Sequence, residues 1–206
     1  MHNANVNIVK QRKPFIWTFR LLGFALCMVL FAACFNTREP EPPSGPTNWT
    51  PPTDTRILLS NFAYACTAID LVNYKRCFKE ETYQFRADPT VSANNQGIFN
   101  NWNWDDEQQY LNNLNIRKSP STNINALTFT SEQTNNFTVD SLEYTANYNY
   151  TIATTDTGLV ATTFTGIVIF RMIRNRSNEW QIVHWSDNQR DNQPCWSDLK
   201  LYFFTR

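Results

Sequence analysis

Histidine and glycine are scarce in this sequence, and both shortages narrow its possible chemistry. The 206 residues contain two histidines, His2 and His184, and five glycines. A single histidine behind the N-terminal segment excludes any metal site that needs two histidine ligands. There is no glycine-rich loop of the kind that holds phosphates, and no nucleophile elbow. The sequence therefore predicts neither a bound metal nor a cofactor.

An excess of positive charge is also missing. The chain has 18 basic and 18 acidic residues, but Lys10, Arg12, Lys13 and Arg20 all precede residue 34 and no acid does. The remainder carries 14 basic and 18 acidic residues, a formal net charge of about −4. Binding to a nucleic-acid backbone depends on clustered Lys and Arg. Nucleic acid is therefore excluded as a partner.

The N-terminus over residues 1–33 has the three parts of an export signal. A basic segment ends at Arg20, an apolar run covers 21–33, and the small residues that close this run precede Cys34. The run has signal-peptide length and is short for a membrane span. An uncleaved membrane helix and plain secretion remain as alternatives, although Arg20 would be costly inside a longer helix.

The four residues Phe31-Ala32-Ala33-Cys34 resemble a bacterial lipobox, in which two small residues stand before a cysteine. Phe31 departs from the usual leucine. The resemblance implies cleavage after residue 33 and lipidation of Cys34, where two or three acyl chains such as palmitate would anchor the protein in a membrane. Phe35 stands where an aspartate would retain a lipoprotein in the inner membrane, so the outer membrane is expected if the cell has two.

Residues 34–53 are rich in proline. Pro40, Pro42, Pro43, Pro46, Pro51 and Pro52 all fall within them. Such a stretch forms neither helix nor sheet and behaves as a semi-rigid spacer. The sequence thus predicts a tether that holds a domain over 54–206 away from the bilayer.

Helical patterning begins directly after this tether. Thr53 or Asp54 can cap a helix that begins at Thr55. Apolar residues then recur at helical spacing until the pattern breaks near Asp70, and the same spacing resumes as far as Phe78. Two consecutive helices, or one broken helix, fit this pattern.

The next residues are less regular. Residues 82–86 are a short strand candidate, and 88–97 are expected to form a loop. Asp105 with Gln108 three residues later predicts the start of a further helix.

After residue 120 the apolar pattern changes from helical to alternating, which is typical of strands with one buried face. Strands are expected at 124–134, 137–155, 159–174 and 180–186, followed by a short aromatic tail at 199–204. Helices that precede a meander of antiparallel strands predict an α+β domain, with N-terminal helices packed on one face of a curved sheet.

The order of these elements resembles the nuclear transport factor 2-like cone fold. Thr50-Pro51-Pro52 before the first helix, the strand 180–187 and the segment 196–200 are similar to parts of small bacterial lipoproteins of that superfamily. The similarity covers roughly residues 50–204. It implies a fold but no activity, because the same cone hosts isomerases, dehydratases, cyclases and pure binding modules.

His184 is the one conventional acid or base near neutral pH behind the signal segment. In a regular strand it would share a face with Trp180, Ile182 and Ser186. A cone enzyme would point it into the cavity beside a second acid or a tyrosine. The candidates for that partner are Asp70, Asp88, Glu143, Tyr144 and Tyr148. The alternative is a structural histidine among aromatic side chains.

Aromatic residues make up 15 % of the chain. Tyr144 and Tyr148 belong to a strand stripe that forms either a core or a pocket for a flat apolar ligand. Trp102 and Trp104 lie in an asparagine-rich stretch. They are either exposed for contact with a sugar or a partner, or folded down over the wide end of the cone. With His184, these four are the candidate ligand-binding residues.

Cys66, Cys77 and Cys195 lie in the exported part of the chain, where a disulfide is permitted. Cys66 falls on the apolar stripe of the first helix and is expected to be packed. Cys77 lies too far along a continuous helix to reach Cys66. Pairing of Cys195 with Cys77 or with Cys66 would join the C-terminal segment to the helices and leave one thiol free. Together with His184, these spacings match no zinc module.

These features favour a membrane-anchored envelope lipoprotein whose domain is a non-catalytic binding or assembly module. Its ligand is unspecified, and a protein partner or a second copy of the chain is possible. The alternative is a small-molecule isomerase, dehydratase or cyclase that uses His184 in the cone cavity. That enzyme would require His184 to face an enclosed pocket within hydrogen-bond reach of a polar partner.

Overall fold

The computed structural model describes residues 48–121, 124–159 and 162–206. They belong to one compact unit, Asn48–Arg206. The expected signal peptide, the lipidation site Cys34 and residues 34–47 of the proline-rich tether lie outside the described residues. Within the described ranges, no helix has both the length and the apolar character that crossing a membrane requires.

Helices come first along the chain and long strands follow. The elements are α2 (Thr55–Ala68), α3 (Leu71–Arg76), the 3-10 helix η1 (Glu80–Thr82), β1 (Gln84–Arg86), α4 (Pro89–Asn94), α5 (Trp104–Ile116), β2 (Ala126–Thr138), β3 (Ser141–Thr151), β4 (Thr163–Arg174), β5 (Trp180–Gln189) and α6 (Trp196–Phe204). The strands form one sheet in the order β1-β5-β4-β3-β2. The four long strands are antiparallel, whereas β1 runs parallel to β5 at the edge. The predicted α+β class is confirmed.

The first two helices begin and end at residues suited to those positions. The Asp54 carboxylate accepts a 2.7 Å hydrogen bond from a backbone N–H of the first turn of α2. Ile69 adopts a left-handed conformation with φ 50° and terminates α2. The Asp70 carboxylate then accepts bonds from two backbone N–H groups of α3, each at 3.1 Å. The break expected near Asp70 is confirmed, and capping of the second helix explains it.

Three later helices differ from the sequence-based expectation. Segment 88–97, expected as a loop, contains α4, which Asp88 caps and Pro89 opens. α5 begins before Asp105, because Asn103 and Asp106 form its capping box. The C-terminal aromatic tail is helical and forms α6.

The turn between the first two long strands lies at 139–140 rather than at 135–136. Asn135 remains in the ladder opposite Glu143. Two successive asparagines resemble a turn signal, but pairing with β3 extends through them. The hairpin is consequently longer than expected, and β3 begins at Ser141.

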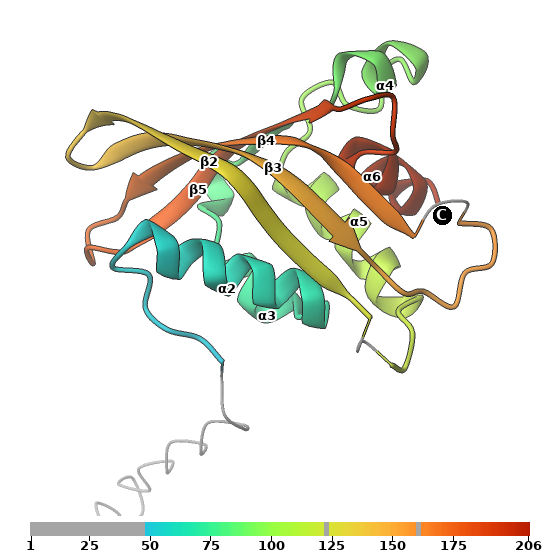
Figure 1. Ribbon diagram of the computed structural model, residues 1–206, viewed down its shortest axis with the longest axis horizontal. Coiled ribbons are helices and arrows are strands. Elements are labelled where there is room, and N and C mark those ends of the chain that lie inside the picture. Colours follow the sequence, from blue (N-terminus) through green and yellow to red (C-terminus); the bar gives the residue numbers. More distant parts are fainter. Residues whose placement is uncertain (1–47, 122–123, 160–161) are drawn as a thin grey trace, which may run out of the picture. The chain divides into compact units, whose positions relative to one another are not determined.

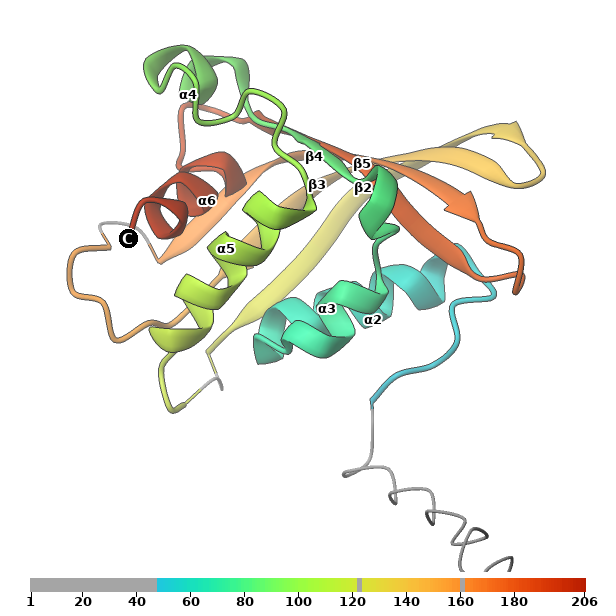
Figure 2. The same ribbon diagram turned by 180° about the vertical axis from the view of Figure 1, so that it is seen from behind.

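The helices α2, α3, α5 and α6 lie against one face of the twisted sheet, here called the inner face (Figures 1 and 2). In the described part of the chain, the opposite, outer face carries only α4, which lies at its edge beside β1 (Figure 1). Trp185 lies at the centre of the inner face, with ring centroids 5.7 Å from Phe62, 5.3 Å from Phe170 and 4.6 Å from Trp196. All four side chains are fully buried or nearly so. The high aromatic content of the sequence therefore fills the core of the domain.

Candidate functional site

A β-bulge at Val183 decides which way His184 points. Two consecutive residues of β4 pair with His184 and Ile182, so Val183 is an extra residue without a partner. An extra residue reverses the alternation of faces along a strand. Ile182 and Trp185 consequently both face the core with no exposed surface, while His184 between them faces outward.

The prediction that His184 shares a face with Trp180 and Ile182 is therefore wrong. His184 is half-buried on the outer face, where its Nε2 lies 3.0 Å from the Ser186 hydroxyl. It lines open clefts and not an enclosed cavity. The condition set for a cone enzyme that uses His184 is not met.

Of the acidic residues proposed as partners of His184, Glu143 alone shares its face. Glu143 lies on β3 opposite Arg171, which lies opposite His184 on β5. Asp70 and Asp88 instead cap α3 and α4 through their carboxylates. The Asp88 carboxylate also accepts a 2.8 Å bond from the backbone N–H of residue 189.

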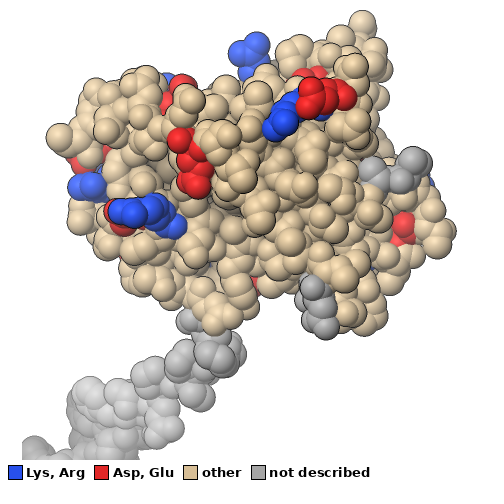
Figure 3. Space-filling model, viewed as in Figure 1, with Lys and Arg blue, Asp and Glu red and all other residues tan. Residues whose placement is uncertain are grey.

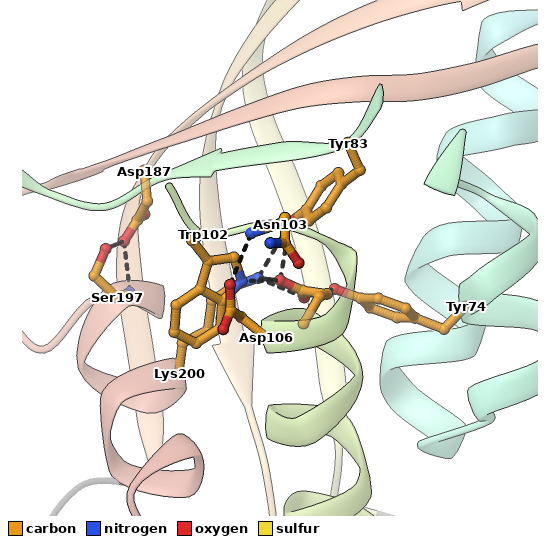
Figure 4. Close-up of polar contacts among 9 residues, drawn as sticks. Tyr74, Tyr83, Trp102, Asn103, Asp106, Asp187, Ser197 and Lys200 are labelled. Atoms are coloured by element: carbon orange, nitrogen blue, oxygen red, sulfur yellow. Dashed lines mark hydrogen bonds and ion pairs between the residues drawn. The ribbon is translucent and has the colours of Figure 1, made fainter. Parts of the chain in front are cut away.

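The inner side of the domain contains a buried ion pair (Figure 4). Lys200 on α6 donates hydrogen bonds to both carboxylate oxygens of Glu107 on α5, and neither side chain has exposed surface. Glu107 also accepts bonds from the Tyr74 hydroxyl at 2.7 Å, the Tyr83 hydroxyl at 2.9 Å and the Trp102 indole at 2.8 Å. A buried carboxylate with this many donors is compensated for its loss of water.

The Lys200 amine is surrounded by aromatic rings. Its Nζ lies 4.0 Å from the ring centre of Trp185 and 4.1 Å from that of Phe85. Burial lowers the pKa of Lys200 to about 8, although the neighbouring Glu107 acts in the opposite direction. The pair joins α5 to α6. Because solvent does not reach the amine, the pair offers no group to a ligand.

A second buried network ties α6 to the sheet. The Asp187 carboxylate accepts bonds from the Ser197 backbone N–H at 2.7 Å, the Ser197 hydroxyl at 2.6 Å and the Tyr148 hydroxyl at 2.8 Å. The Tyr148 oxygen in turn accepts a 2.6 Å bond from the Trp196 N–H. Burial raises the pKa of Asp187, and the bonds from Ser197 and Tyr148 oppose that rise. Tyr148, a candidate ligand-binding residue, is thus occupied inside the protein.

The other candidate ligand-binding aromatics are also packed. Trp102 has no exposed surface and Trp104 has 9 %, so of the two alternatives for these rings the exposed one, for contact with a sugar or a partner, is wrong and both rings are folded inward. The Trp102 indole reaches Glu107 and its ring lies 5.2 Å from that of Phe99, which accounts for its inward position. Tyr144 is buried on the inner face and donates a 2.9 Å bond to Glu132.

Little open space remains between the helices and the sheet. The apolar pocket lined by Cys66, Leu111 and Trp196, among others, leaves about 10 Å³. That volume holds at most one water molecule and no substrate. Aromatic side chains occupy the place where a cone enzyme would bind its ligand.

The cysteines of the described part are separate thiols. Cys66, Cys77 and Cys195 are all buried and unpaired, so the predicted disulfides of Cys195 are contradicted. Cys66 is packed in the core, as expected. The Cys77 thiol donates to the Asn73 carbonyl at 3.3 Å. Burial raises the pKa of each thiol.

Two adjoining clefts on the outside share Gln84, Arg86 and His184. One measures about 650 Å³ and runs over β4 and β5, where Arg171 and Glu143 line it. The other, about 470 Å³, lies beside β1 and α4. Together they are called the outer cleft. Because the candidate residue His184 lines both clefts, the outer cleft is the candidate functional site.

Positive charge surrounds His184 in the outer cleft. Burial, Arg86 and Arg171, in that order, lower the pKa of His184, and Glu143 opposes them. Charge is otherwise sparse: in the view of Figure 3 the surface is mostly uncharged, with a few small groups of Lys, Arg, Asp and Glu. No three His, Cys, Asp or Glu side chains in the described ranges gather as metal ligands.

Sequence reasoning missed four residues of the two buried networks, Glu107, Lys200, Asp187 and Ser197. A signal was available for two of them. Ser197 and Lys200 are three residues apart in a segment whose other residues, apart from Asp198, are apolar or aromatic, and this spacing places them on one side of a helix. Glu107 and Asp187 could not be matched to them, because the pairing joins elements that are far apart in the sequence.

No protein-family model and no curated protein matches this sequence. Solved structures do match the fold. A "putative aromatic ring hydroxylase" from Novosphingobium aromaticivorans is 16 % identical, with a TM-score of 0.51 over 65 % of this chain and 85 % of that one. A nuclear transport factor 2-like superfamily protein from Salmonella enterica is 15 % identical, with a TM-score of 0.50 over 68 % and 94 %. The domain has the nuclear transport factor 2-like fold, and at these identities the likeness extends to the fold alone.

Proposed function

We propose that this domain is a non-catalytic binding or assembly module, anchored in the bacterial cell envelope through a lipid on Cys34. The filled interior carries the proposal. Where a cone enzyme would enclose its substrate, about 10 Å³ is left among aromatic side chains. A domain of this kind interacts through its outside, with a ligand, a protein partner or a second copy.

The anchor part of the proposal is supported by the sequence before the domain. The lipobox-like residues end at Cys34, and the described domain begins at Asn48. A proline-rich chain of this length extends at most roughly 40 Å. The module would therefore work close to the membrane surface. Position 35 holds Phe35 instead of the aspartate that would retain a lipoprotein in the inner membrane, so we propose the outer membrane if the cell has two.

Mass spectrometry of the full-length protein extracted with detergent tests the anchor. We expect an N-terminal peptide that begins at Cys34 and carries acyl chains. The variant Cys34→Ser should leave the membrane fraction, whereas Cys27→Ser, one cysteine earlier in the chain, should stay in it. An intact Met1 or an unmodified Cys34 in the wild-type protein would contradict the anchor.

Ligand binding to the interior tests the non-catalytic part. Flat apolar compounds such as indole should not raise the thermal unfolding temperature of the wild-type protein. The variant Trp196→Ala should gain such a shift, because an apolar cavity left by a ring binds a small aromatic molecule. Circular dichroism establishes that this variant is folded, and Phe170→Leu serves as a milder alternative. Equal binding by wild type and variant would show that the interior is open and overturn the proposal.

A further inference from the structure

A row of polar side chains crosses the outer face of the sheet. The strand register places Glu143 opposite Arg171, and Arg171 opposite His184. On the other side of β5, His184 lies opposite Gln84 of β1. Side chains opposite each other on one face of a sheet have Cβ atoms about 5 Å apart. The imidazole thus lies within reach of a guanidinium on one side and an amide on the other.

Arg86 and Arg171 lie on the two strands that flank β5, one on either side of His184. Arg86 pairs with Ser186, the next outward residue of β5, and Arg171 pairs with His184 itself. The strands that carry the two arginines flank β5 and are about 10 Å apart. Arginine side chains are long enough to meet above the strand between them. A group above His184 and Ser186 would receive donors from both sides.

No ion pair among residues 48–121, 124–159 and 162–206 includes Arg86 or Arg171, although Glu143 lies opposite Arg171 on the neighbouring strand. Arg171 lies instead over the ring of Phe137, at 5.6 Å. Arg117 and Arg174, by contrast, each lie beside an aspartate. Two unpaired guanidinium groups on one cleft of an acidic protein favour an anionic ligand.

The wall of the cleft next to these charges is apolar. Ile169, Ile173 and Val183 line it together with Arg171 and His184. A cleft of about 650 Å³ has the size of a small-molecule site. On the outer face of β4, Arg171 lies between Ile169 and Ile173, so an aliphatic side chain flanks the cationic position on each side along the strand.

We propose that Arg86, Arg171 and His184 bind a phosphate monoester whose aliphatic part lies along Ile169, which is paired with Ser186. This inference rests on the proposed function, because it names the ligand class of the binding module. It does not depend on the lipid anchor. In the free protein the Arg171 guanidinium lies over Phe137, and binding would turn it toward the ligand. The tetrahedral dianion would then have a guanidinium group on either side and the Ser186 hydroxyl beneath it as a further donor.

His184 would couple this binding to pH. In the free protein Arg86 and Arg171 lower the pKa of His184, and Glu143 is the carboxylate that opposes them. Lys79, from the segment before β1, is the remaining cation in the same cleft. A bound dianion offsets the two guanidinium charges, so the imidazole takes up a proton. Anion binding should therefore strengthen as the pH falls.

The first experiment titrates the full-length protein, solubilised in a non-ionic detergent, with sulfate. Sulfate stays dianionic from pH 5.5 to 8, so any pH dependence of sulfate binding arises from titration of groups in the protein. The imidazole NMR signals of His184 report binding, and comparison with His184→Gln separates them from those of His2. We expect saturable shifts and binding about tenfold tighter at pH 5.5 than at pH 8. His184→Gln should remove that pH dependence. Absence of saturable shifts would overturn the proposal.

Matched variants separate a site from general charge attraction. Arg86→Ala and Arg171→Ala should each weaken sulfate binding about tenfold. Arg176→Ala removes the same charge from an exposed position in the turn between β4 and β5, outside the cleft. It should change binding by about twofold or less. Equal weakening by all three variants would show attraction without a site.

A comparison of inorganic phosphate with butyl phosphate tests the aliphatic contact with Ile169. Butyl phosphate should bind several-fold more tightly, and Ile169→Thr should remove that advantage. Equal binding of the two would refute the phosphate monoester and leave the cleft selective for a free oxyanion. The soluble variant Cys34→Ser should bind like the wild type. If mass spectrometry shows no lipid anchor, the proposed localisation is refuted and the anion site is unaffected. If the protein does not bind the anion, the anion site is refuted and the proposed localisation is unaffected.

Discussion

Lys200 donates hydrogen bonds to both carboxylate oxygens of Glu107, and the two side chains are fully enclosed between α5 and α6. Replacing Lys200 with methionine would leave a buried carboxylate without its counter-charge. We expect the free energy of unfolding to fall by about 3–5 kcal/mol. Urea-induced unfolding followed by tryptophan fluorescence measures this loss.

A second variant distinguishes loss of charge from loss of packing. The double variant Glu107→Gln, Lys200→Met buries no charge and keeps an acceptor for Tyr74 or Tyr83. It should be about 1–3 kcal/mol more stable than Lys200→Met alone. A double variant no more stable than the single one would mean that the cost lies in packing.

His184 should titrate below its ordinary value of 6.5, because burial and the two arginines favour the neutral ring. Between the folded and unfolded pKa values the unfolded chain binds more protons than the folded one. The stability of the free protein should thus fall as the pH drops through this window and recover as it rises. An imidazole NMR titration at low salt measures the pKa directly.

The neighbours of His184 supply the controls for that titration. Arg86→Ala and Arg171→Ala should each raise the pKa of His184, while Glu143→Gln should lower it further. Arg176→Ala should leave it unchanged. If the pKa of His184 is the same in Arg86→Ala and Arg171→Ala as in the wild type, the two guanidinium groups do not lie close enough to the imidazole to affect it.

The thiols of Cys66, Cys77 and Cys195 should resist alkylation in the folded protein at pH 8. All three are buried, and burial raises the pKa of each, so the reactive thiolate is scarce and shielded. Peptide mapping after treatment with iodoacetamide should find them unmodified, and modified once the chain is unfolded in urea. A peptide linking Cys195 to Cys66 or Cys77 would restore the disulfide that the structure contradicts.

The local features of the fold could be predicted from the sequence. Asp54 and Asp70 cap helices where helical spacing begins, and alternating residues define the long strands, because both signals come from the nearest neighbours in the chain. The edge strand β1 lies within the strand candidate at 82–86, but its partner could not be predicted. It pairs with β5, about a hundred positions later, and no local pattern records that contact.

The candidate site was the harder part to predict, and a single residue explains why. The bulge at Val183 reverses the faces of β5, and this moves His184 from the face that a regular strand would give it to the outer cleft. A bulge is a property of two paired strands and not of one sequence segment. Trp102 is a second case in which a distant contact decides the orientation. Its asparagine-rich setting left an exposed position open, whereas its indole donates a hydrogen bond to the buried Glu107 on α5 and therefore points inward.

Ser197 should be the most sensitive serine of the domain, because its side chain joins three elements. Its hydroxyl donates to Asp187 on β5 at 2.6 Å and accepts a 2.9 Å bond from the backbone N–H of Asp88, which caps α4. Ser197→Ala would leave a buried N–H without an acceptor and take one donor from a buried carboxylate. We expect a loss of about 1–3 kcal/mol in the free energy of unfolding. Ser177→Ala, in the exposed turn before β5, should cost about 0.5 kcal/mol or less. Equal costs for the two would mean that α6 is held by its aromatic packing, with no contribution from the Asp187 network.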